Sequence, residues 1–373
     1  MSNYQLHITA LSPIHIGTGD ELTPDEYVIC PGQGDGSMLY AVNLPAFFAD
    51  MTTAQRRKFN QAVAASSITA VRKFLADNVD ISRHTRWRSA ASPELYELYR
   101  HGLDDASQQL QVRPMTRTGT DRHAYIPGSS IKGAIRTAVL QDIVDADDRL
   151  RRITVSQRPR RREAASVEAR ILGNIRSNDR PEIRADPFRA VRVGDCRLPT
   201  DATAVDPVDL ISLRRGRGGA DPAGIQMFYE MTFSMLDDEE IRGHGTLNIK
   251  TGLADIDTRR VRRWDFDHAV SRTITVEKIV SACNQFYRAR LEDESGRVRA
   301  VCQDVGPVYD KLLHAAEGMR DNETLIRLGR FSHVECVTLA RPLSRARGGN
   351  SRALAAGQLP MGWAKLTISN AGS

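Results

Sequence analysis

The stretch Tyr125-Ile126-Pro127-Gly128-Ser129-Ser130-Ile131-Lys132-Gly133-Ala134-Ile135-Arg136 contains a Pro-Gly turn between a short strand-like run and the first turn of an expected helix. Either serine after the turn is able to cap that helix, because a serine side chain accepts a backbone N–H at a helix start. Apolar residues then recur at four-residue spacing, the pattern of a core-facing helix side: Ile131, Ile135, Val139 and Ile143. We therefore expect a helix from Ser130 to about Asp145, packed against a core.

The same turn brings together groups that bind a phosphate. Free N–H groups and the hydroxyls of Ser129 and Ser130 lie at the helix start. Lys132 and Arg136 are four residues apart and share one helix face. Gly133 has no Cβ, so a backbone or a ligand is able to come close one turn into the helix. The pattern predicts a phosphate site, although it is also typical of ordinary turn and capping chemistry.

Two segments near the N-terminus, taken with this turn, resemble a known family. Leu11–Asp20 (LSPIHIGTGD) closes a first strand, and Pro24–Ile29 (PDEYVI) starts another. With Ile126–Gly133 they resemble the RAMP superfamily of CRISPR effector subunits. Within that superfamily, the segment Ser12–Ile29 (SPIHIGTGDELTPDEYVI) is similar to the fifth subunits of type III-A (Csm) complexes. Asp186–Asp195 and Leu359–Leu366 are similar to later strands of that family.

The resemblance implies a RAMP-type ferredoxin-like or RRM-like core. It also implies a non-catalytic RNA-binding subunit of a type III CRISPR effector complex in antiviral defence, which caps the backbone filament near the 3′ end of the guide RNA (crRNA). Such a subunit contributes to guide maturation and to target RNA binding. The implied partners are guide RNA, target RNA and adjacent RAMP backbone subunits, and a further option is the recruitment of host nucleases. No cofactor is implied.

The order of expected elements is that of an α+β protein. Strands flank one helix, and further strands, a second helix and a final strand follow, so two ferredoxin-like halves fit, the second degenerate. We place the first half in residues 1–42 and 113–145, with an inserted helical subdomain in 43–112. A basic, arginine-rich insertion follows in 146–185, and 186–373 hold the remaining core and the degenerate half.

Individual strands and helices follow from apolar spacing and turn residues. Tyr4 to Ser12 alternate in polarity, which predicts a half-buried strand. Tyr27–Cys30 and Met38–Val42, on either side of a glycine-rich turn, predict a hairpin. Further elements are expected at Phe188–Cys196 (strand), Met227–Met235 and Thr246–Lys250 (paired strands), Val276–Tyr287 and Pro307–Met319 (helices), and Gly329–Ala340 and Trp363–Ile368 (strands).

The charge of the chain favours a polyanionic partner. The net charge is +6, the sequence pI is about 9.2, and only seven of the 52 basic residues are lysines. Arginine makes bidentate phosphate contacts and stacks on bases, which suits RNA. A GC-rich genome, which favours arginine codons, would produce the same excess of arginine over lysine.

Cysteine usage and hydropathy exclude several classes of protein. The five cysteines are Cys30, Cys196, Cys283, Cys302 and Cys336. Their wide spacing, with no C-x-x-C pair, indicates neither a disulfide framework nor a zinc site. No apolar signal segment and no run of eighteen apolar residues occurs, so we expect a cytoplasmic protein without a membrane partner.

Two basic segments are candidates for RNA contact. The first is the arginine run made up of Arg149, Arg151, Arg152, Arg158, Arg160, Arg161, Arg162, Arg170, Arg176, Arg180 and Arg184. The second is a loop near 205–224 that carries Arg214, Arg215 and Arg217. RAMP subunits resemble a hand whose β-hairpin thumb reaches over the guide–target duplex, and we place the thumb in this loop. An ordinary surface loop is the alternative.

The end of the first strand completes the expected site. In a ferredoxin-like unit this end lies beside the start of the first helix, so His15 and Gly17 are expected to share one groove with the Pro-Gly turn. His15 either contacts RNA or is a satisfied histidine at a strand end. The predicted RNA-binding residues are His15, Gly17, Ser129, Ser130, Lys132, Gly133, Arg136, Arg214, Arg215 and Arg217. Because aromatic residues make up only 6% of the chain, backbone contacts should dominate the affinity.

The alternative function is a metal- or histidine-dependent endoribonuclease of the same superfamily. Some members cut RNA with an aspartate soon after the first strand, where Asp20, Asp25 and Asp35 match by position but not by context. The processing endonucleases of the family use an N-terminal histidine, which His15 matches by position. They also use a C-terminal glycine-rich loop, where Leu328–His333 has one glycine. We therefore expect no catalytic residue and no metal ligand.

Overall fold

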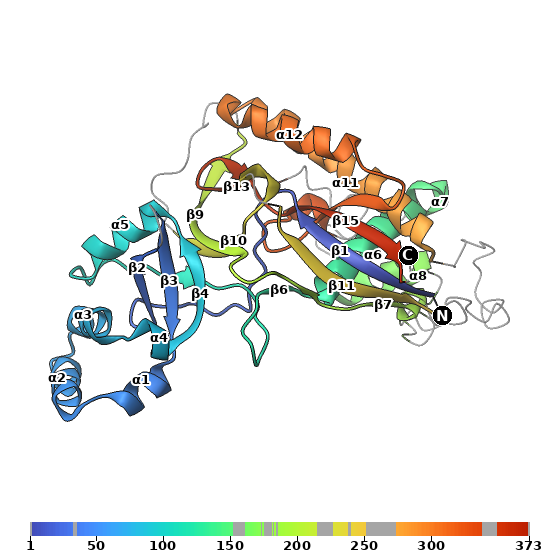
Figure 1. Cartoon of the computed structure of the whole chain (residues 1–373). Helices are drawn as coiled ribbons and strands as arrows, with labels where there is room; N and C mark the ends of the chain where they lie inside the picture. Colours follow the sequence, from blue (N-terminus) through green and yellow to red (C-terminus); the bar gives the residue numbers. More distant parts are fainter. Residues whose placement is uncertain are drawn as a thin grey trace.

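A computed structural model of the chain describes residues 2–32, 36–151, 161–172, 186–214, 227–237, 240–250, 274–337 and 349–371, and the single positions 174, 181 and 183. Within these ranges the chain forms two β-sheets that lie side by side in two lobes (Figure 1). Both sheets contain strands from the N-terminal and the C-terminal parts of the sequence.

The first sheet has the order β12–β15–β1–β11–β8–β6, with β7 also paired to β11. Its strands are β1 (Ser2–Ala10), β6 (Tyr125–Ile126), β7 (Val191–Val193), β8 (Cys196–Arg197), β11 (Arg242–Ile249), β12 (Glu323–Arg327) and β15 (Trp363–Asn370). The central strand β1 pairs antiparallel with both β11 and β15. The predicted first and last strands are therefore confirmed, and they are neighbours.

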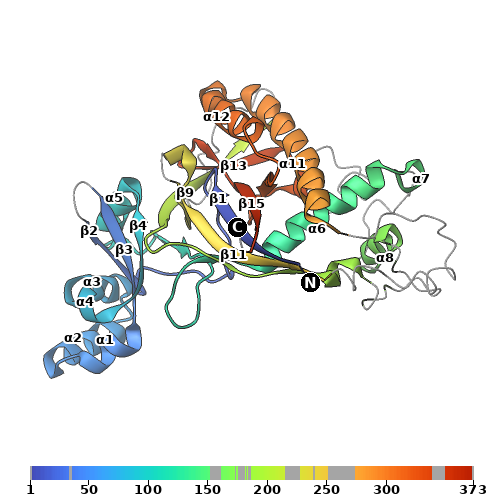
Figure 2. The same cartoon turned by 45° about the vertical axis from the view of Figure 1, so that its right-hand side comes forward.

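Two long helices, α6 (Gly128–Asp145) and α11 (Val276–Arg299), pack on one face of this sheet (Figure 2). The sequence of elements β1, α6, β7, β11, α11, β15, in the sheet order β15–β1–β11–β7, is the ferredoxin-like arrangement. The predicted α+β class and ferredoxin-like core are confirmed. The remaining helices of this lobe are α7 (Asp148–Arg151), α8 (Arg161–Leu172) and α12 (Gly306–Glu317), with 3₁₀ turns at Pro187–Ala190, Met235–Asp237, Gln303–Val305 and Val334–Cys336.

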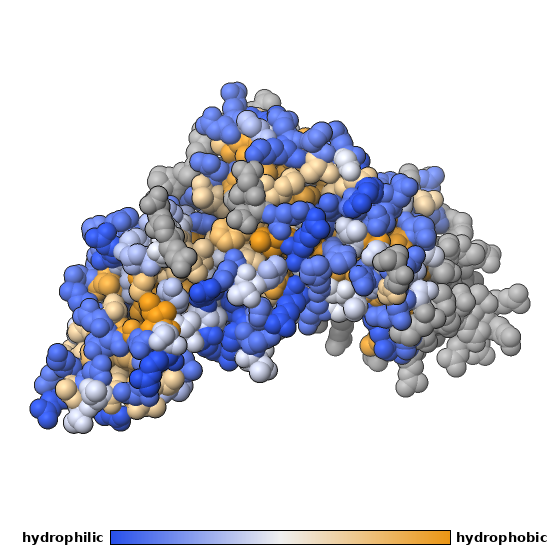
Figure 3. All heavy atoms as spheres, viewed as in Figure 1, coloured by the Kyte–Doolittle hydropathy of each residue, from blue (hydrophilic) through white to orange (hydrophobic). Residues whose placement is uncertain are grey.

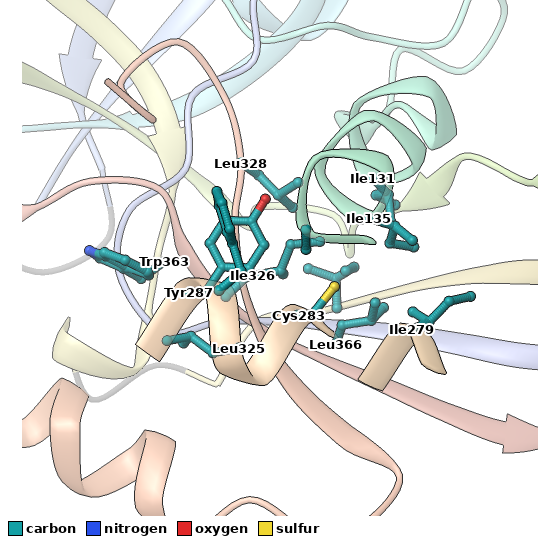
Figure 4. Packing of buried hydrophobic residues seen from close by; sticks show 14 of the residues in the cluster. Ile131, Ile135, Ile279, Cys283, Tyr287, Leu325, Ile326, Leu328, Trp363 and Leu366 are labelled. Atoms are coloured by element: carbon teal, nitrogen blue, oxygen red, sulfur yellow. The ribbon is translucent and has the colours of Figure 1, made fainter. Parts of the chain in front are cut away.

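The core of this lobe is formed by the apolar residues that alternate along strand β1 and recur at about four-residue spacing in the helices. Leu6 and Ile8 of β1 are buried, while His7 between them is half-buried and Gln5 before them is exposed. Ile131 and Ile135 of α6 face the same cluster as Ile279, Cys283 and Tyr287 of α11 (Figure 4). Truncating one of these buried aliphatic side chains to alanine should cost about 2–5 kcal/mol.

The second sheet has the order β14–β13–β9–β4–β3–β2, and β10 pairs with β9 and β5. Its strands are β2 (Tyr27–Pro31), β3 (Ser37–Val42), β4 (Thr85–Ala91), β5 (Val112–Arg113), β9 (Thr203–Ser212), β10 (Phe228–Thr232), β13 (Ser351–Ala355) and β14 (Leu359–Pro360). The helices α1 (Leu44–Asp50), α2 (Thr53–Ala64), α3 (Ile68–Asn78), α4 (Ile81–His84) and α5 (Pro93–Gly102) lie in this lobe. The predicted β2–β3 hairpin is confirmed.

Three expectations about strands are wrong. Residues 329–337 of the strand expected at Gly329–Ala340 form turns and a 3₁₀ turn, because the positive φ of Gly329 ends the extended chain after β12, and 338–340 lie outside the described residues. The strands expected at Met227–Met235 and Thr246–Lys250 do not pair with each other, because β10 belongs to the second sheet and β11 to the first. The strand expected at Phe188–Cys196 begins with a 3₁₀ turn, which starts where the carboxylate of Asp186 accepts the N–H of Phe188. Strand propensity is local, whereas the pairing partner is set by tertiary packing.

The basic segments are described only in part. Strand β9 occupies most of the first half of the loop expected near 205–224. Arg214 is exposed just after this strand, and Arg215 and Arg217 lie outside the described residues. Much of the arginine run between 149 and 184 also lies outside them. No helix in the described part of the chain is long and apolar enough to cross a bilayer.

Candidate nucleic-acid interface

An open cavity of about 630 Å³, which we call the first cavity, lies where three segments of the chain meet. Its walls are the residues after β1, the first turns of α6 and the residues after β12. His15, Gly17, Ser130, Gly133, Gly329 and Arg330 represent these three segments. The expectation that the end of the first strand and the start of the first helix form one groove is confirmed.

Backbone hydrogen bonds join the segment after β1 to the segment after β12 and to the residues before β15. The N–H of Arg330 donates to the carbonyl oxygen of His15 at 3.1 Å, and the N–H of Gly362 donates to that of Pro13 at 2.8 Å. Gly329 has a φ of 87°, and a Cβ there would lie 2.3 Å from the carbonyl oxygen of His15. Only glycine allows this close approach, so the single glycine of Leu328–His333 forms the junction between the segments.

His15 is a buried, neutral histidine at the edge of this cavity. Its side chain is 4% exposed, and Nδ1 donates to the carbonyl oxygen of Glu230 at 2.7 Å. The ring packs edge-to-face on Tyr229, with centroids 5.0 Å apart. Burial lowers the pKa of His15 to about 4. A Cβ on Gly17 would lie 2.8 Å from Nε2, so Gly17 leaves room for the ring.

A buried carboxylate that the sequence did not reveal supports this histidine. Glu230 is completely buried in β10, pairs with Arg117, and accepts from the Thr203 hydroxyl and from the N–H of Met115. From the sequence, a buried glutamate in a strand cannot be told from an exposed one, because the alternation of polar and apolar residues does not show which polar side chains are buried. These three partners satisfy the carboxylate and fix the backbone that holds His15.

The start of α6 leaves less room for a ligand than the sequence analysis predicted. Pro127 is the N-cap residue and no side chain caps the helix, so the expectation that Ser129 or Ser130 caps it is wrong. The N–H of Gly128 donates instead to Asp195, at 2.8 Å. A Cβ on Gly128 would lie 2.3 Å from the carbonyl oxygen of Val193, so the helix start packs tightly against the β7–β8 turn.

The open part of α6 lies one turn later. Ser130 and Gly133 line the first cavity, and a Cβ on Gly133 would meet no atom within 4 Å. The carbonyl of the next residue, Ala134, accepts from the Tyr287 hydroxyl at 3.0 Å. Ser129 is exposed and is not among the residues that line the cavity.

The two cations of α6 bind the protein itself. Lys132 donates from Nζ to the carbonyl oxygen of Val191, and burial lowers the pKa of its ammonium group. Arg136 pairs with Asp186 at 2.9 Å and with Glu168 at 3.2 Å. Neither lines the first cavity. To reach a phosphate, both would have to give up these contacts.

Two other arginines supply the positive charge of the first cavity. Arg113 pairs with Glu21 at 2.6 Å and lies over the ring of Tyr229. For the guanidinium of Arg330, no acceptor is found among the described residues. Sequence analysis missed both, because neither arginine belongs to the motifs and only folding brings it into the same cavity.

A buried ion cluster forms the base of the third wall. The carboxylate of Glu294 pairs with Arg327 at 2.6 Å and with Arg352 at 2.7 Å, and accepts from the Tyr309 hydroxyl. Burial acts to raise the pKa of Glu294, but the two guanidiniums outweigh it and lower the pKa to about 2. These buried pairs give the segment after β12 a fixed support.

In the described ranges, no group of three histidine, cysteine or acidic side chains is placed to hold a metal ion. Asp20 lines the first cavity, but its carboxylate accepts from the Thr18 hydroxyl at 2.6 Å. Asp35 lies outside the described residues. The five cysteines are unpaired, and Cys196 and Cys283 are buried.

A family model described as the RAMP superfamily matches residues 7–221, which is more than half of the chain. The chain belongs to the RAMP superfamily. The match covers the first cavity's walls from β1 and α6, and thus the two motifs that carried the resemblance.

Curated RAMP relatives carry the name Csm5. Two proteins described as "CRISPR system Cms protein Csm5", from Mycobacterium tuberculosis strains CDC 1551 and H37Rv, are each 23% identical to this chain over 225 residues. The aligned part covers 56% of this chain and 56% of each relative. The chain thus spans about half the length of the curated relatives it matches.

Solved structures extend the similarity over nearly the whole chain. A chain of the cryo-EM structure of a Csm–crRNA–target RNA ternary complex of a type III-A system matches with a TM-score of 0.67 and 19% identity, covering 98% of this chain and 100% of that one. The crystal structure of T. onnurineus Csm5 matches with a TM-score of 0.65 and 18% identity, covering 97% and 99%. The similarity in fold therefore continues beyond residue 221.

Proposed function

We propose that this RAMP protein is a non-catalytic RNA-binding subunit of a type III CRISPR effector complex. It caps the backbone filament near the 3′ end of the guide RNA and contributes to guide maturation and target RNA binding. The observation that carries the proposal is the first cavity, where His15 and Gly17 meet Ser130, Gly133 and the free guanidinium of Arg330. Similarity in fold to a chain of a Csm–crRNA–target RNA complex supports it.

The chemistry of the first cavity suits a sugar-phosphate backbone. Arg330 and the Ser130 hydroxyl offer hydrogen-bond donors, and Gly133 leaves the surface of α6 open to a strand. The aromatic residues nearby are engaged internally, since Tyr229 packs on His15 and Tyr287 bonds to α6. Binding through the backbone leaves base sequence unread, as a protein that holds any guide requires.

RNA binding by the purified chain tests the proposal. We would titrate a labelled, unstructured RNA at several salt concentrations with the native protein, with Arg330→Ala and with Arg100→Ala. Arg330→Ala should weaken binding and reduce the salt slope by about 0.7, the value for one phosphate contact on a single strand. Arg100, an exposed arginine paired with Glu97 on α5, is the matched control for charge.

Two results would overturn the proposal. If the native chain does not bind RNA, the function is wrong. If Arg330→Ala binds as tightly as Arg100→Ala, with the same slope, the first cavity is not the RNA site.

The competing function is an endoribonuclease that uses His15. One observation favours it: His15 lines the first cavity as a neutral imidazole whose Nδ1 is the donor, which leaves Nε2 free to accept a proton. With a pKa of about 4, it would be a weak base. Labelled RNA incubated with and without EDTA separates the two functions. Specific cleavage that disappears in His15→Ala would replace the scaffold proposal.

The place in the complex needs a separate experiment. Tagged protein purified from its host should bring down adjacent RAMP backbone subunits and guide RNA. Host nucleases in the same preparation would indicate that the subunit also recruits trimming enzymes. Nuclease treatment before the pull-down distinguishes subunits that are held by protein contacts from those held only by RNA.

A further inference from the structure

A second, smaller cavity of about 170 Å³ lies between a hairpin at 116–125, the start of β4 and the loop before β9. In the hairpin, Arg117 and Ala124 form a β-bridge and the N–H of Thr118 donates to the carbonyl of His123. The hairpin projects from the body beside β6 (Figures 1 and 2). Figure 3 shows hydrophilic residues along this margin, between the two lobes.

The carboxylates of this second cavity are already neutralised. Asp201 receives two hydrogen bonds from Arg88, at 2.8 and 2.7 Å. This pairing lowers the pKa of Asp201 and raises that of Arg88. Asp121, on the hairpin, pairs with Arg197 at 2.5 Å. No other acidic residue lines the cavity.

Two guanidiniums in the second cavity are left without a carboxylate. Arg86 is exposed on β4 and Arg122 is half-buried in the hairpin. Neither side chain has a hydrogen bond or ion pair to any described residue. Since Arg88 and Arg197 already compensate the acids, the cavity carries an excess of positive charge.

A third arginine of this cavity has an unused buried donor. Arg117 is one-tenth exposed, pairs with Glu230, donates to the carbonyl of Arg122 at 2.7 Å and lies 4.0 Å above the ring of Trp87. Its Nε is buried and has no hydrogen-bond partner. Because this atom is closed off from the cavity, Arg117 contributes the charge of its wall and fixes the backbone of Arg122, rather than offering Nε to an anion.

We propose that the second cavity is a phosphate site for an RNA strand, separate from the first cavity, formed by Arg86, Arg122 and Arg117. The inference rests on the proposed RNA-binding function and adds a second contact to it. The volume is below the roughly 300 Å³ of ordinary small-ligand pockets, so it suits a phosphate group and excludes a whole nucleotide. Arginines in this number favour bidentate phosphate recognition.

One residue connects the two cavities. The carbonyl oxygen of Glu230 accepts from His15 at the first cavity, and its carboxylate pairs with Arg117 at the second. Glu230 of β10 therefore contacts a lining residue of each cavity. A single strand that enters the first cavity can place a neighbouring phosphate in the second.

The test removes the two unpaired guanidiniums together. Arg86→Ala with Arg122→Ala should weaken the binding of an unstructured RNA about 3- to 10-fold near 0.1 M salt and reduce the salt slope by about 0.7. The matched control is Arg57→Ala with Lys58→Ala, which removes the same charge from exposed positions on α2. Far-UV circular dichroism and the urea midpoint should be unchanged in both, because neither variant removes a contact within the described residues.

Each outcome bears on the proposal in a distinct way. An unchanged slope, or an equal loss in the control, overturns the second site. If Arg330→Ala still lowers affinity, the RNA-binding function survives that failure. The second experiment measures the melting temperature with added inorganic phosphate at constant ionic strength. If phosphate raises the melting temperature of the native protein but not of the double variant, and RNA binding is the same in both, the cavity binds free phosphate and the proposal is overturned. Loss of a protein partner alone would show an acidic protein surface as the ligand, and this too would overturn the proposal.

Discussion

Lys132 donates from Nζ to the carbonyl oxygen of Val191, 2.7 Å away, and so connects helix α6 to the edge strand β7. Arg136, one turn later, lies 5.0 Å above the ring of Phe188 and pairs with Asp186. The cationic face of α6 therefore binds the segment that leads into β7. The first cavity opens on a neighbouring face of the same helix, at Ser130 and Gly133.

Replacing both cations tests this assignment. From sequence alone, Lys132→Ala with Arg136→Ala is expected to weaken guide loading with folding intact. The structure predicts instead that stability falls while RNA binding is kept. The free energy of unfolding should decrease by about 1–3 kcal/mol, because a buried carbonyl and two carboxylates lose their partners. Urea denaturation measures the loss, and RNA titration should give an unchanged salt slope. Reduced guide occupancy at native stability would restore the phosphate role of these residues.

Substitutions at Gly133 distinguish an effect on stability from an effect on RNA binding. Because a Cβ there meets no atom within 4 Å, Gly133→Ala should stabilise the protein by about 0.5–1 kcal/mol through helix propensity. Gly133→Leu should fold as well and reduce RNA affinity severalfold, because its side chain enters the first cavity. Gly128→Ala is the contrasting variant, and its clash with Val193 should destabilise the fold. Native affinity in Gly133→Leu would show that RNA does not use this cavity.

His15 predicts how stability depends on pH. Its folded pKa of about 4 is below the ordinary value of 6.5, so the unfolded chain binds the proton more readily between these values. Stability should fall as pH decreases from about 6.5 to 4, with up to about 3 kcal/mol from this group. His15→Gln keeps a donor near the Glu230 carbonyl and should reduce the slope of the urea midpoint against pH over that range. His333, whose pKa is also lowered to about 4 by burial, should add to the native slope.

Glu294 is expected to be essential for the wall behind Arg330. Glu294→Ala leaves the guanidinium of Arg327 buried without a carboxylate and removes one of the two carboxylate partners of Arg352, which keeps Glu335, and this should cost about 3–5 kcal/mol. Glu97→Ala, at an exposed pair on α5, should change stability by less than about 0.5 kcal/mol. Similar unfolding midpoints for the two variants would contradict the supporting role of the ion cluster.

Much of the fold was accessible from local patterns. Alternation identified β1, four-residue spacing identified α6 and α11, and glycine-rich turns identified the β2–β3 hairpin. Strand β12, two strands from β1 in the sheet, was missed, because its five residues are all buried and so show no alternation. The partners of β10 and β11 were also inaccessible, since the same strand pattern fits either sheet.

The sequence by itself determined the elements, the superfamily motifs and the meeting of His15 and Gly17 with the start of α6. The elements and motifs depend on residues close together in the chain, whose spacing reports directly on backbone geometry, and the meeting of His15 with α6 follows from the ferredoxin-like order of those elements. Only the tertiary structure decided which way the charges of α6 point, and that Arg330, rather than Lys132, reaches the first cavity. An ion pair forms between residues far apart in sequence, such as Arg136 and Asp186, so a local pattern shows that a cation is present but not which acceptor takes it.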